Sequence, residues 1–320
     1  MELTFYCKIM RIVFMGSPDF AIPSLEKIYQ SNHQLAAVVS NKDKRRGRGG
    51  KKSPTAVKAW AEERQIPIVT VEDPKDPGFA LEMEAINPDL IVVVAFRILP
   101  EAVLEIPSKG SINLHASLLP KYRGAAPIHW AVINGEAETG CTVFFLKQKV
   151  DTGDIIKQQK TPIGLEETTG DVYNRLKQIG ADLLLDAVNE IAEDRFQTIP
   201  QEDEKATPAP KLYREDCLIN PEQPAEQVHN KIRGLSPFPT AYAWLDGQKF
   251  NLYRSKTGPD IEVMAGQLTT YDDRLLLGCS SGTVELLEVQ LEGRKRVSGS
   301  DFVNGYNGPM NLELDHSENS

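Results

Sequence analysis

The chain has 320 residues and a mass of 35.6 kDa, with 41% hydrophobic and 25% charged residues. At about 150 residues per domain this length predicts two domains, and the composition excludes a collagen, a coiled coil and a wholly disordered protein. The net charge of −9, from 36 basic and 45 acidic residues, is unlike that of a general nucleic-acid binder. The apolar run at 90–96 is far shorter than the about 20 residues of a membrane helix, so no membrane contact is expected.

The amino-terminal residues and the cysteines both predict a cytoplasmic protein. Residues 1–16 carry Lys8 and Arg11 inside their apolar stretch and have no small-residue cleavage site, so no signal peptide is expected. Residues 1–9 are interpreted as an extension before the first strand. The cysteines have neither C-x-x-C nor metal-ligand spacing, which predicts reduced thiols and no bound metal. They are Cys7, Cys141, Cys217 and Cys279.

Residues 10–198 alternate between strand-like and helix-like patterns, which predicts a doubly wound α/β domain with a mostly parallel sheet. The expected strands are apolar throughout, as a sheet buried on both faces requires. They cover residues 11–15, 35–39, 66–69 and 90–94, with helices at 20–28, 55–64, 81–86 and 169–195. Ligands of such sheets bind at the carboxyl ends of the strands. The first strand is not followed by G-x-G-x-x-G, which argues against NAD or FAD.

The carboxyl-terminal third has a different sequence pattern. Proline and charged residues at 199–213 predict a linker, and residues 214–310 hold short strand patterns separated by turn signals. Asp246-Gly247 and Ser281-Gly282 are two of these signals. The spacing predicts a small antiparallel barrel, followed by a polar tail at 311–320.

The candidate catalytic residues are Asn113, His115 and Asp151. Asn113 and His115 are two positions apart on a strand-like run, so their side chains share one face, and Asp151 lies in a loop-forming sequence. An amide that donates to an oxyanion, an imidazole that exchanges protons and a carboxylate that orients it would suit acyl transfer. On spacing alone two alternatives stay open: Asn113 and His115 could be structural, and residues 151–154 could be a simple turn.

Three sequence stretches carry a family resemblance. N-L-H-A-S-L-L-P-K-Y-R-G-A-A-P-I at 113–128, E-T-G-C-T-V at 138–143 and V-D-T-G-D-I-I at 150–156 resemble the 10-formyltetrahydrofolate-dependent formyltransferases. Within this family the chain is most similar to members that formylate methionyl-tRNA, and the resemblance runs from residue 15 to residue 296. It implies a Rossmann-like catalytic domain at 10–198, an OB-like tRNA-binding domain at 214–310, and Asn113, His115 and Asp151 as catalytic residues.

The resemblance also implies a site for the formyl donor, 10-formyltetrahydrofolate, and no metal. Its residues would be Ser117, Leu118, Leu119 and Pro120, together with the loop Asp151, Thr152, Gly153 and Asp154. One departure borders this site. Where the family reads A-Y-G-x-I-L-P after the fourth strand, this chain reads A-F-R-I-L-P at 95–100, which is one residue shorter.

A cationic arm at residues 41–53 holds seven basic residues and one acidic residue, with three interspersed glycines. It is either a solvated loop or an arm that orders on contact with phosphates. The resemblance favours the second interpretation and implies tRNA contacts by Arg45, Arg46, Arg48, Lys51 and Lys52. In the carboxyl-terminal domain Arg294, Lys295 and Arg296 form a second basic cluster. Tyr242, Trp244 and Tyr253 could stack on bases, although two of the three are expected in the barrel core.

The function implied is transfer of a formyl group to methionyl initiator tRNA by a monomer. Three alternative functions compete with it: a formyltransferase acting on a sugar nucleotide, a formyltetrahydrofolate hydrolase, and a non-catalytic RNA-binding protein. The cationic arm argues against the first two, and the intact Asn113, His115 and Asp151 set argues against the third.

Overall fold

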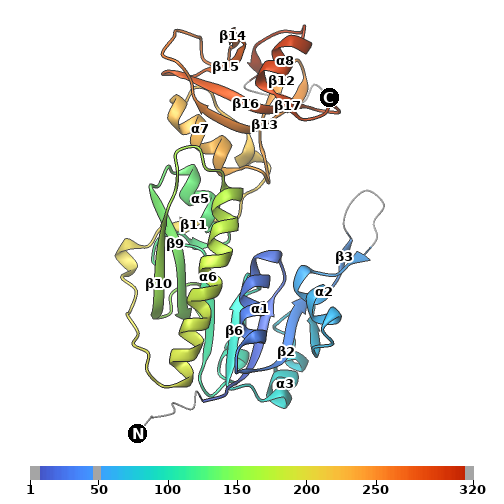
Figure 1. Cartoon of the computed structure of the whole chain (residues 1–320), viewed down its shortest axis with the longest axis vertical. Helices are drawn as coiled ribbons and strands as arrows, with labels where there is room; N and C mark the ends of the chain where they lie inside the picture. The colour runs from blue at the N-terminus through green and yellow to red at the C-terminus, as the bar shows by residue number, and fades with distance from the viewer. Residues whose placement is uncertain (1–7, 46–51, 314–320) are drawn as a thin grey trace. The chain divides into compact units, whose positions relative to one another are not determined.

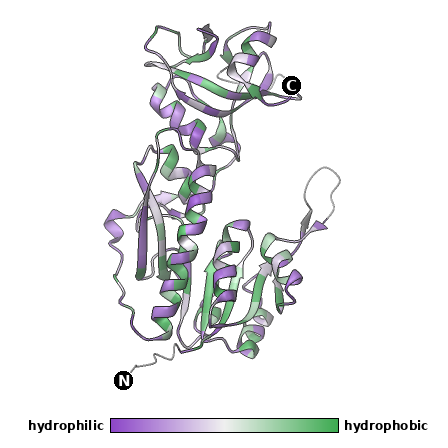
Figure 2. Cartoon of the chain, viewed as in Figure 1, coloured by the Kyte–Doolittle hydropathy of each residue, from purple (hydrophilic) through white to green (hydrophobic). Residues whose placement is uncertain are grey.

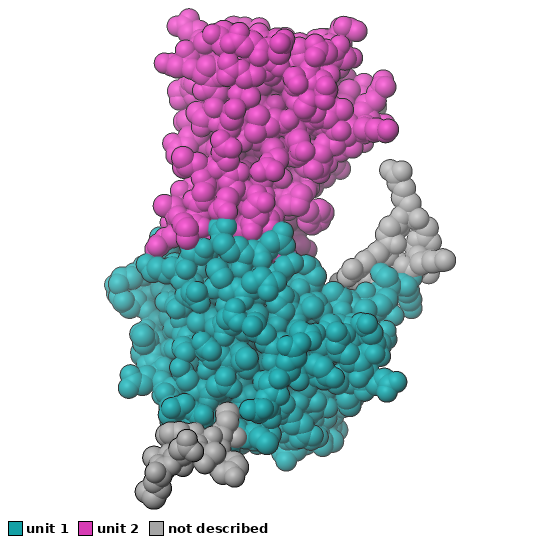
Figure 3. Space-filling view, viewed as in Figure 1, with its two compact units in different colours: residues 1–124, 140–161, 174–208 teal, residues 125–139, 162–173, 209–320 magenta. Residues whose placement is uncertain are grey.

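The structure, a computed structural model, describes residues 8–45 and 52–313 (Figure 1). The chain divides into two compact units, which Figure 3 shows in two colours. Unit 1 comprises residues 1–124, 140–161 and 174–208, and unit 2 comprises residues 125–139, 162–173 and 209–320. Of the expected linker, residues 199–208 belong to unit 1 and residues 209–213 to unit 2.

A seven-stranded mixed sheet forms the centre of unit 1, in the order β10-β9-β7-β6-β1-β2-β5. The pairs β7–β6, β6–β1, β1–β2 and β2–β5 are parallel, whereas β9 is antiparallel to β7. The mostly parallel α/β fold predicted from the sequence is therefore confirmed. The strands are β1 (Arg11–Gly16), β2 (Gln34–Asn41), β5 (Ile68–Val71), β6 (Leu90–Val94), β7 (Ser111–His115), β9 (Glu138–Phe145) and β10 (Ile155–Pro162).

The central strands are buried on both faces, which explains why they read as continuous apolar runs. Figure 2 shows them as the most hydrophobic part of the sheet. Every residue of β6 and β7 is buried, and Val13, Met15 and Ile91 have no exposed surface. Such a sheet holds the residues at its carboxyl edge in fixed positions, because its strands have packed neighbours on both sides.

Local capping sets the helix limits. Thr55 accepts a hydrogen bond from the Lys58 amide and starts α2, and Asp76 does the same for α3 through Gly78. Helix α3 is therefore longer than expected, and β5 begins two residues later than expected, after a left-handed residue at Gln65 with φ 55°. The helices are η1 (Asp19–Ala21), α1 (Ile22–Gln30), α2 (Ala56–Glu63), α3 (Pro77–Ile86), α4 (Glu101–Leu104), α5 (Pro127–Ile133), α6 (Thr169–Ala192) and η2 (Asp203–Lys205).

Unit 2 contains an antiparallel sheet in the order β14-β15-β16-β13-β12-β18, with β17 paired to β16. The ends of the sheet meet at an antiparallel bridge between Gln267 and Asn311, so it closes on itself as the predicted barrel requires. Asp246 and Gly247 both have positive φ, as the predicted hairpin turn between β12 and β13 demands. The elements are η3 (Glu215–Cys217), α7 (Ala225–Gly234), β12 (Ala241–Leu245), β13 (Gln248–Thr257), β14 (Leu268–Tyr271), β15 (Arg274–Gly278), β16 (Thr283–Leu291), β17 (Val297–Ser298), α8 (Gly299–Gly305) and β18 (Leu312–Glu313).

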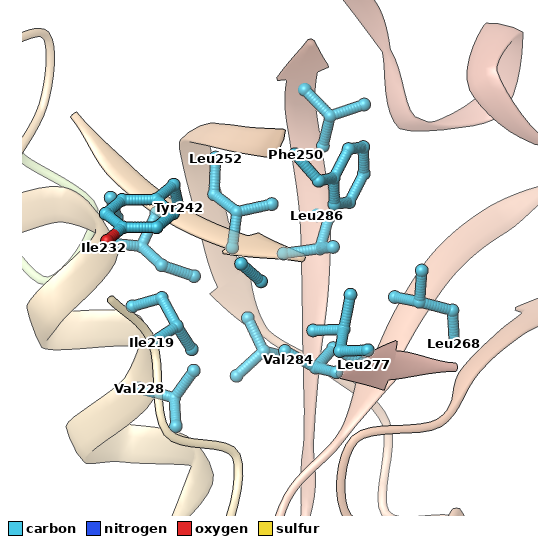
Figure 4. Packing of buried hydrophobic residues seen from close by; sticks show 14 of the residues in the cluster. Ile219, Val228, Ile232, Tyr242, Phe250, Leu252, Leu268, Leu277, Val284 and Leu286 are labelled. Atoms are coloured by element: carbon cyan, nitrogen blue, oxygen red, sulfur yellow. The ribbon is translucent and has the colours of Figure 1, made fainter. Parts of the chain in front are cut away.

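The core of unit 2 lies between helix α7 and the inner face of this sheet (Figure 4). Val228 and Ile232 of α7 pack in one cluster with Leu252 and Val284 of the strands. Tyr242 belongs to this cluster and Trp244 packs against it, so two of the three aromatic residues are in the core, as expected.

Four short strands complete the description: β3 (Lys44–Arg45), β4 (Lys52–Ser53), β8 (Arg123–Gly124) and β11 (Pro208–Ala209). Strands β3 and β4 pair antiparallel at the base of the cationic arm. Within the described residues no helix is both long enough and apolar enough to cross a membrane.

Candidate active site

Strand β7 brings Asn113 and His115 to the centre of the sheet in unit 1. Asn113 lies opposite Val93 of β6 and Phe144 of β9, and His115 is the last residue of the strand. Because side chains alternate along a strand, Asn113 and His115 project from the same face. His115 therefore lies at the carboxyl end of β7, the edge at which the sequence analysis places functional residues.

The His115 ring has a defined orientation. Its Nε2 lies 2.8 Å from the Tyr122 carbonyl oxygen, and its Nδ1 lies 3.8 Å from Asp151 Oδ2. A carbonyl oxygen only accepts hydrogen bonds, so Nε2 must carry a hydrogen and donate it. The nitrogen that can gain or lose a proton is therefore Nδ1, on the side of the Asp151 carboxylate.

Asp151 lies in the loop that follows β9. Its Oδ2 accepts a hydrogen bond of 2.9 Å from the Gly124 amide, and its side chain is only 11% exposed. The backbone of Asp151 is left-handed, with φ 52°, a conformation that aspartate tolerates better than most residues. The structure thus brings the predicted histidine and carboxylate together, at a separation slightly longer than a hydrogen bond.

Asn113 is largely buried, with 9% of the residue exposed. Among residues 8–45 and 52–313 its side chain has no hydrogen-bond partner. Both polar atoms of this amide keep some solvent-accessible surface, so a substrate oxygen can reach them. This amide is therefore free to donate to a substrate oxygen.

Gly153 is essential to the path of the loop, because it lies against the end of β9. A Cβ at this position would lie 1.5 Å from the Phe145 carbonyl oxygen. The loop is anchored there by a 3.0 Å hydrogen bond from the Phe145 amide to the Asp154 carbonyl. Only glycine permits this close approach of two backbones.

The residues predicted to bind the formyl donor either follow β7 or lie in the loop that contains Asp151. Ser117 is fully buried and donates to the Lys121 carbonyl, and the Leu119 carbonyl accepts from Gln158. Leu118 and Pro120 are half-buried. In the loop, Thr152 donates to Lys149, Gly153 is buried, and Asp154 pairs with Lys147 at 2.9 Å.

The departure at residues 95–100 forms a loop directly after β6. Ala95 adopts a left-handed backbone with φ 50°, Leu99 is buried and Ile98 is 67% exposed. Arg97 donates to the Glu72 carbonyl, which ties this loop to the residue after β5.

The predicted tRNA contacts are described only in part. Arg46, Arg48 and Lys51 lie outside the described residues. Arg45 belongs to β3, and Lys52 of β4 is exposed. In unit 2 the Arg296 guanidinium lies 3.5 Å from the centre of the Tyr253 ring and pairs with Glu288 at 3.3 Å, while Arg294 and Lys295 are exposed and, within the described residues, have no carboxylate partner.

The structure shows a second basic surface in unit 2 that the sequence analysis does not predict. A pocket of about 430 Å³ combines the exposed rings of Tyr213 and Phe238 with three cations, Lys211, Arg214 and Lys249. None of these cations forms an ion pair within the described part of the chain. Lys249 lies over the Tyr242 ring at 4.4 Å. The three cations are not consecutive in the sequence, so no run of basic residues indicates this surface.

Cys7 lies outside the described residues, and the three described cysteines are unreactive. Cys141, Cys217 and Cys279 are buried free thiols. Burial raises the pKa of Cys141 and of Cys279 to about 12, so both thiols stay protonated near neutral pH. In the part of the chain that the structure describes, no three His, Cys, Asp or Glu side chains lie close enough to share a metal ion.

The fold is a mostly parallel α/β fold, and the amide, imidazole and carboxylate gathered on it are the groups that acyl transfer uses. A family model described as formyl transferase matches residues 10–188, and one described as formyl transferase, C-terminal domain, matches residues 211–307. The chain belongs to the formyl transferase family, which confirms the resemblance seen in the sequence.

Relatives match the chain almost from end to end. A methionyl-tRNA formyltransferase of Moorella thermoacetica is 43% identical over 93% of this chain and 96% of its own length. One of Syntrophus aciditrophicus is 44% identical over 92% of this chain and 96% of its own length. Both matches are long enough to include both units.

Solved structures share the fold at lower identity. The sugar 3N-formyl transferase WlaRD has a TM-score of 0.67 at 20% identity, with 90% of this chain and 99% of that chain covered. HypX from Aquifex aeolicus, in complex with tetrahydrofolic acid, has a TM-score of 0.61 at 16% identity. That match covers 96% of this chain and 51% of HypX.

Proposed function

We propose that this chain transfers the formyl group of 10-formyltetrahydrofolate to the α-amino group of methionine on initiator methionyl-tRNA, as a monomer in the cytoplasm. The observation that carries the proposal is the match of 43–44% identity to methionyl-tRNA formyltransferases across both units. The geometry of Asn113, His115 and Asp151 supports it, because these three groups supply what formyl transfer to an amine requires.

The amine of the methionyl group attacks the formyl carbon, and negative charge develops on the formyl oxygen. Asn113 donates its unpartnered amide hydrogen to that oxygen. A donor aimed at a developing oxyanion typically lowers the activation free energy by about 2.7 to 4 kcal/mol. The collapse of this tetrahedral species breaks the bond between the formyl carbon and N10 of the folate.

The nitrogen N10 leaves readily only when it takes up a proton, and the attacking amine must lose one. His115 is placed to deliver the proton to N10 through Nδ1, because its Nε2 is held by the Tyr122 carbonyl. The Asp151 carboxylate, 3.8 Å from Nδ1, stabilises the imidazolium and takes up the proton of the amine through an intervening water. Asp151 then passes this proton to Nδ1 of His115, so one proton has left the amine, one has reached the folate, and both side chains are back in their starting states.

The tRNA would be held by charge and by aromatic surface. The arm at 41–53 supplies phosphate contacts through Arg45, Arg46, Arg48, Lys51 and Lys52, since it holds seven basic residues and one acidic residue. In unit 2, Arg294, Lys295 and Arg296 would add contacts, together with the pocket formed by Tyr213, Phe238 and their neighbouring cations.

A formylation assay tests the proposed function directly. Radiolabelled methionyl-tRNA, initiator or elongator, is mixed with the protein with and without 10-formyltetrahydrofolate. We expect formylmethionyl initiator tRNA only with the donor present, and much less product from the elongator species. Formylation of a sugar-nucleotide amine or hydrolysis of the donor, with methionyl-tRNA left unmodified, would refute the proposal.

The Arg48→Ala variant tests the arm. Each phosphate contact releases counterions, so tRNA affinity falls with salt concentration. We expect the variant to bind initiator tRNA more weakly and to reduce the slope of log Kd against log salt by about one unit. Arg195→Ala is the matched control, because Arg195 is 63% exposed and assigned to no site. An unchanged slope and affinity for Arg48→Ala would remove the arm from the interface.

A further inference from the structure

We propose that Gln201 is a positioning residue for the Asp151 loop, an inference that rests on the proposed function. Gln201 Nε2 donates to two backbone carbonyls of the loop, that of Asp151 at 3.0 Å and that of Gly153 at 2.8 Å. The two hydrogens of this side-chain amide therefore bind the carbonyl oxygens of the residues before and after Thr152. The contact fixes the backbone from which the Asp151 carboxylate projects.

The other end of the same amide binds Arg123. Gln201 Oε1 accepts from Arg123 Nε at 3.1 Å and from Arg123 Nη2 at 2.7 Å. The remaining arm of the guanidinium, Nη1, pairs with Asp203 at 2.8 Å. The amide cannot flip without setting its oxygen against two carbonyl oxygens and its NH2 group against a cation.

Arg123 connects this network to the histidine. It directly follows Tyr122, whose carbonyl holds His115 Nε2, and it precedes Gly124, whose amide holds Asp151 Oδ2. The same stretch is tied a second time, since the Tyr122 amide donates to Thr207 Oγ1 and the Arg123 amide donates to the Thr207 carbonyl, both at 2.9 Å. Gln201 thus joins the two backbone segments that set the distance between imidazole and carboxylate.

The chemistry of the contact is specific to glutamine. A glutamate of the same size would keep the acceptor for Arg123 but would offer no hydrogen to the two loop carbonyls. A methionine would fill a similar volume with neither donor nor acceptor. Comparison of these two substitutions separates the volume of the side chain from its hydrogen bonds.

We expect Gln201→Met to lower kcat for formyl transfer about 10-fold or more, since small displacements of reacting groups carry large costs. The KM for methionyl-tRNA should stay within about twofold, because Gln201 contacts the loop and Arg123 rather than the RNA. Gln201→Glu should be similarly impaired. Gln30→Met, an exposed site on α1, is the control for the chemical change and should behave as wild type. Full activity of Gln201→Glu would overturn the inference, as would a rise in KM with kcat unchanged.

A double-mutant cycle with Asp151→Asn distinguishes positioning from a general structural role. If Gln201 acts through Asp151, Gln201→Met should cost less than about twofold in kcat when the carboxylate is already absent. An equal loss in both backgrounds would show that Gln201 does not act through Asp151.

Hydrogen exchange at the Gly124 amide gives a readout that needs no substrate. This amide binds Asp151 Oδ2, so its protection should fall in Gln201→Met and stay unchanged in Gln30→Met. Suppose that the wild-type protein fails to formylate methionyl-tRNA, but the Gly124 amide still loses protection in Gln201→Met. The proposed function is then wrong and the positioning role stands. Unchanged protection would overturn the positioning role itself.

Discussion

The Asn113→Ala variant is expected to lower kcat for formyl transfer by about 100- to 1,000-fold, as loss of one oxyanion donor does in other acyl-transfer sites. Within the described residues the Asn113 amide bonds to no other group, so its removal leaves no new unpaired partner. The free energy of unfolding should therefore change little. Single-turnover transfer to methionyl-tRNA and chemical denaturation measure the two quantities on the same preparation.

Asn304→Ala is the matched control for this experiment, because Asn304 is exposed on α8 and belongs to no proposed site. The Asp151→Asn variant should lose activity in the same range, since its amide oxygen can still accept from Gly124 but carries no charge. A folded Asn113→Ala protein with near-normal turnover would contradict the assignment of the oxyanion donor.

The Gly153→Ala variant should have the second largest effect. Its Cβ would lie 1.5 Å from the Phe145 carbonyl oxygen, so the loop must move away from β9 by roughly the length of a bond. A displacement of about 1 Å in a catalytic group can cost on the order of 100-fold in rate. We expect a loss of that order in kcat, with a loss of about 1–3 kcal/mol in the free energy of unfolding from overpacking.

Gly305→Ala provides the comparison for Gly153→Ala. A Cβ at Gly305, the last residue of α8, would meet no atom within 4 Å. Its activity and stability should match wild type when both variants are measured side by side. Wild-type turnover and unfolding in Gly153→Ala would show that the loop tolerates the displacement and that its backbone path does not set the rate.

The parallel sheet could be predicted from the sequence because its strands leave a local pattern, whereas the catalytic roles of Asn113, His115 and Asp151 depend on the family resemblance and stay predictions. A strand buried on both faces is apolar at every position, as in β6, and Asn113 and His115 lie two apart on one such strand. Strand β10 and helix α7 leave weaker patterns. Strand β10 is exposed at Gln158, Gln159 and Lys160, and α7 buries polar residues such as His229 and Arg233.

The network around Asp151 could not be predicted in the same way. Gln201 stands among prolines and charges in a segment whose composition indicates a linker, and nothing in its neighbours marks it. Its importance depends on four hydrogen bonds to residues 48 to 78 positions away in the chain. Such long-range partners are fixed by tertiary packing, which no local pattern encodes.

The closure of the unit 2 sheet bears on where this protein can be cut or fused. Residues 311–313, expected to be the start of a free polar tail, instead supply the Gln267–Asn311 bridge and strand β18, which pairs with Trp244 and Leu245. A truncation that removes Asn311 and the residues after it would expose the edges of β12 and β14 together. Such unpaired strand edges can pair with strands of other chains. Shortened versions made for crystallisation or display should therefore keep Glu313, or self-association will replace a monodisperse product.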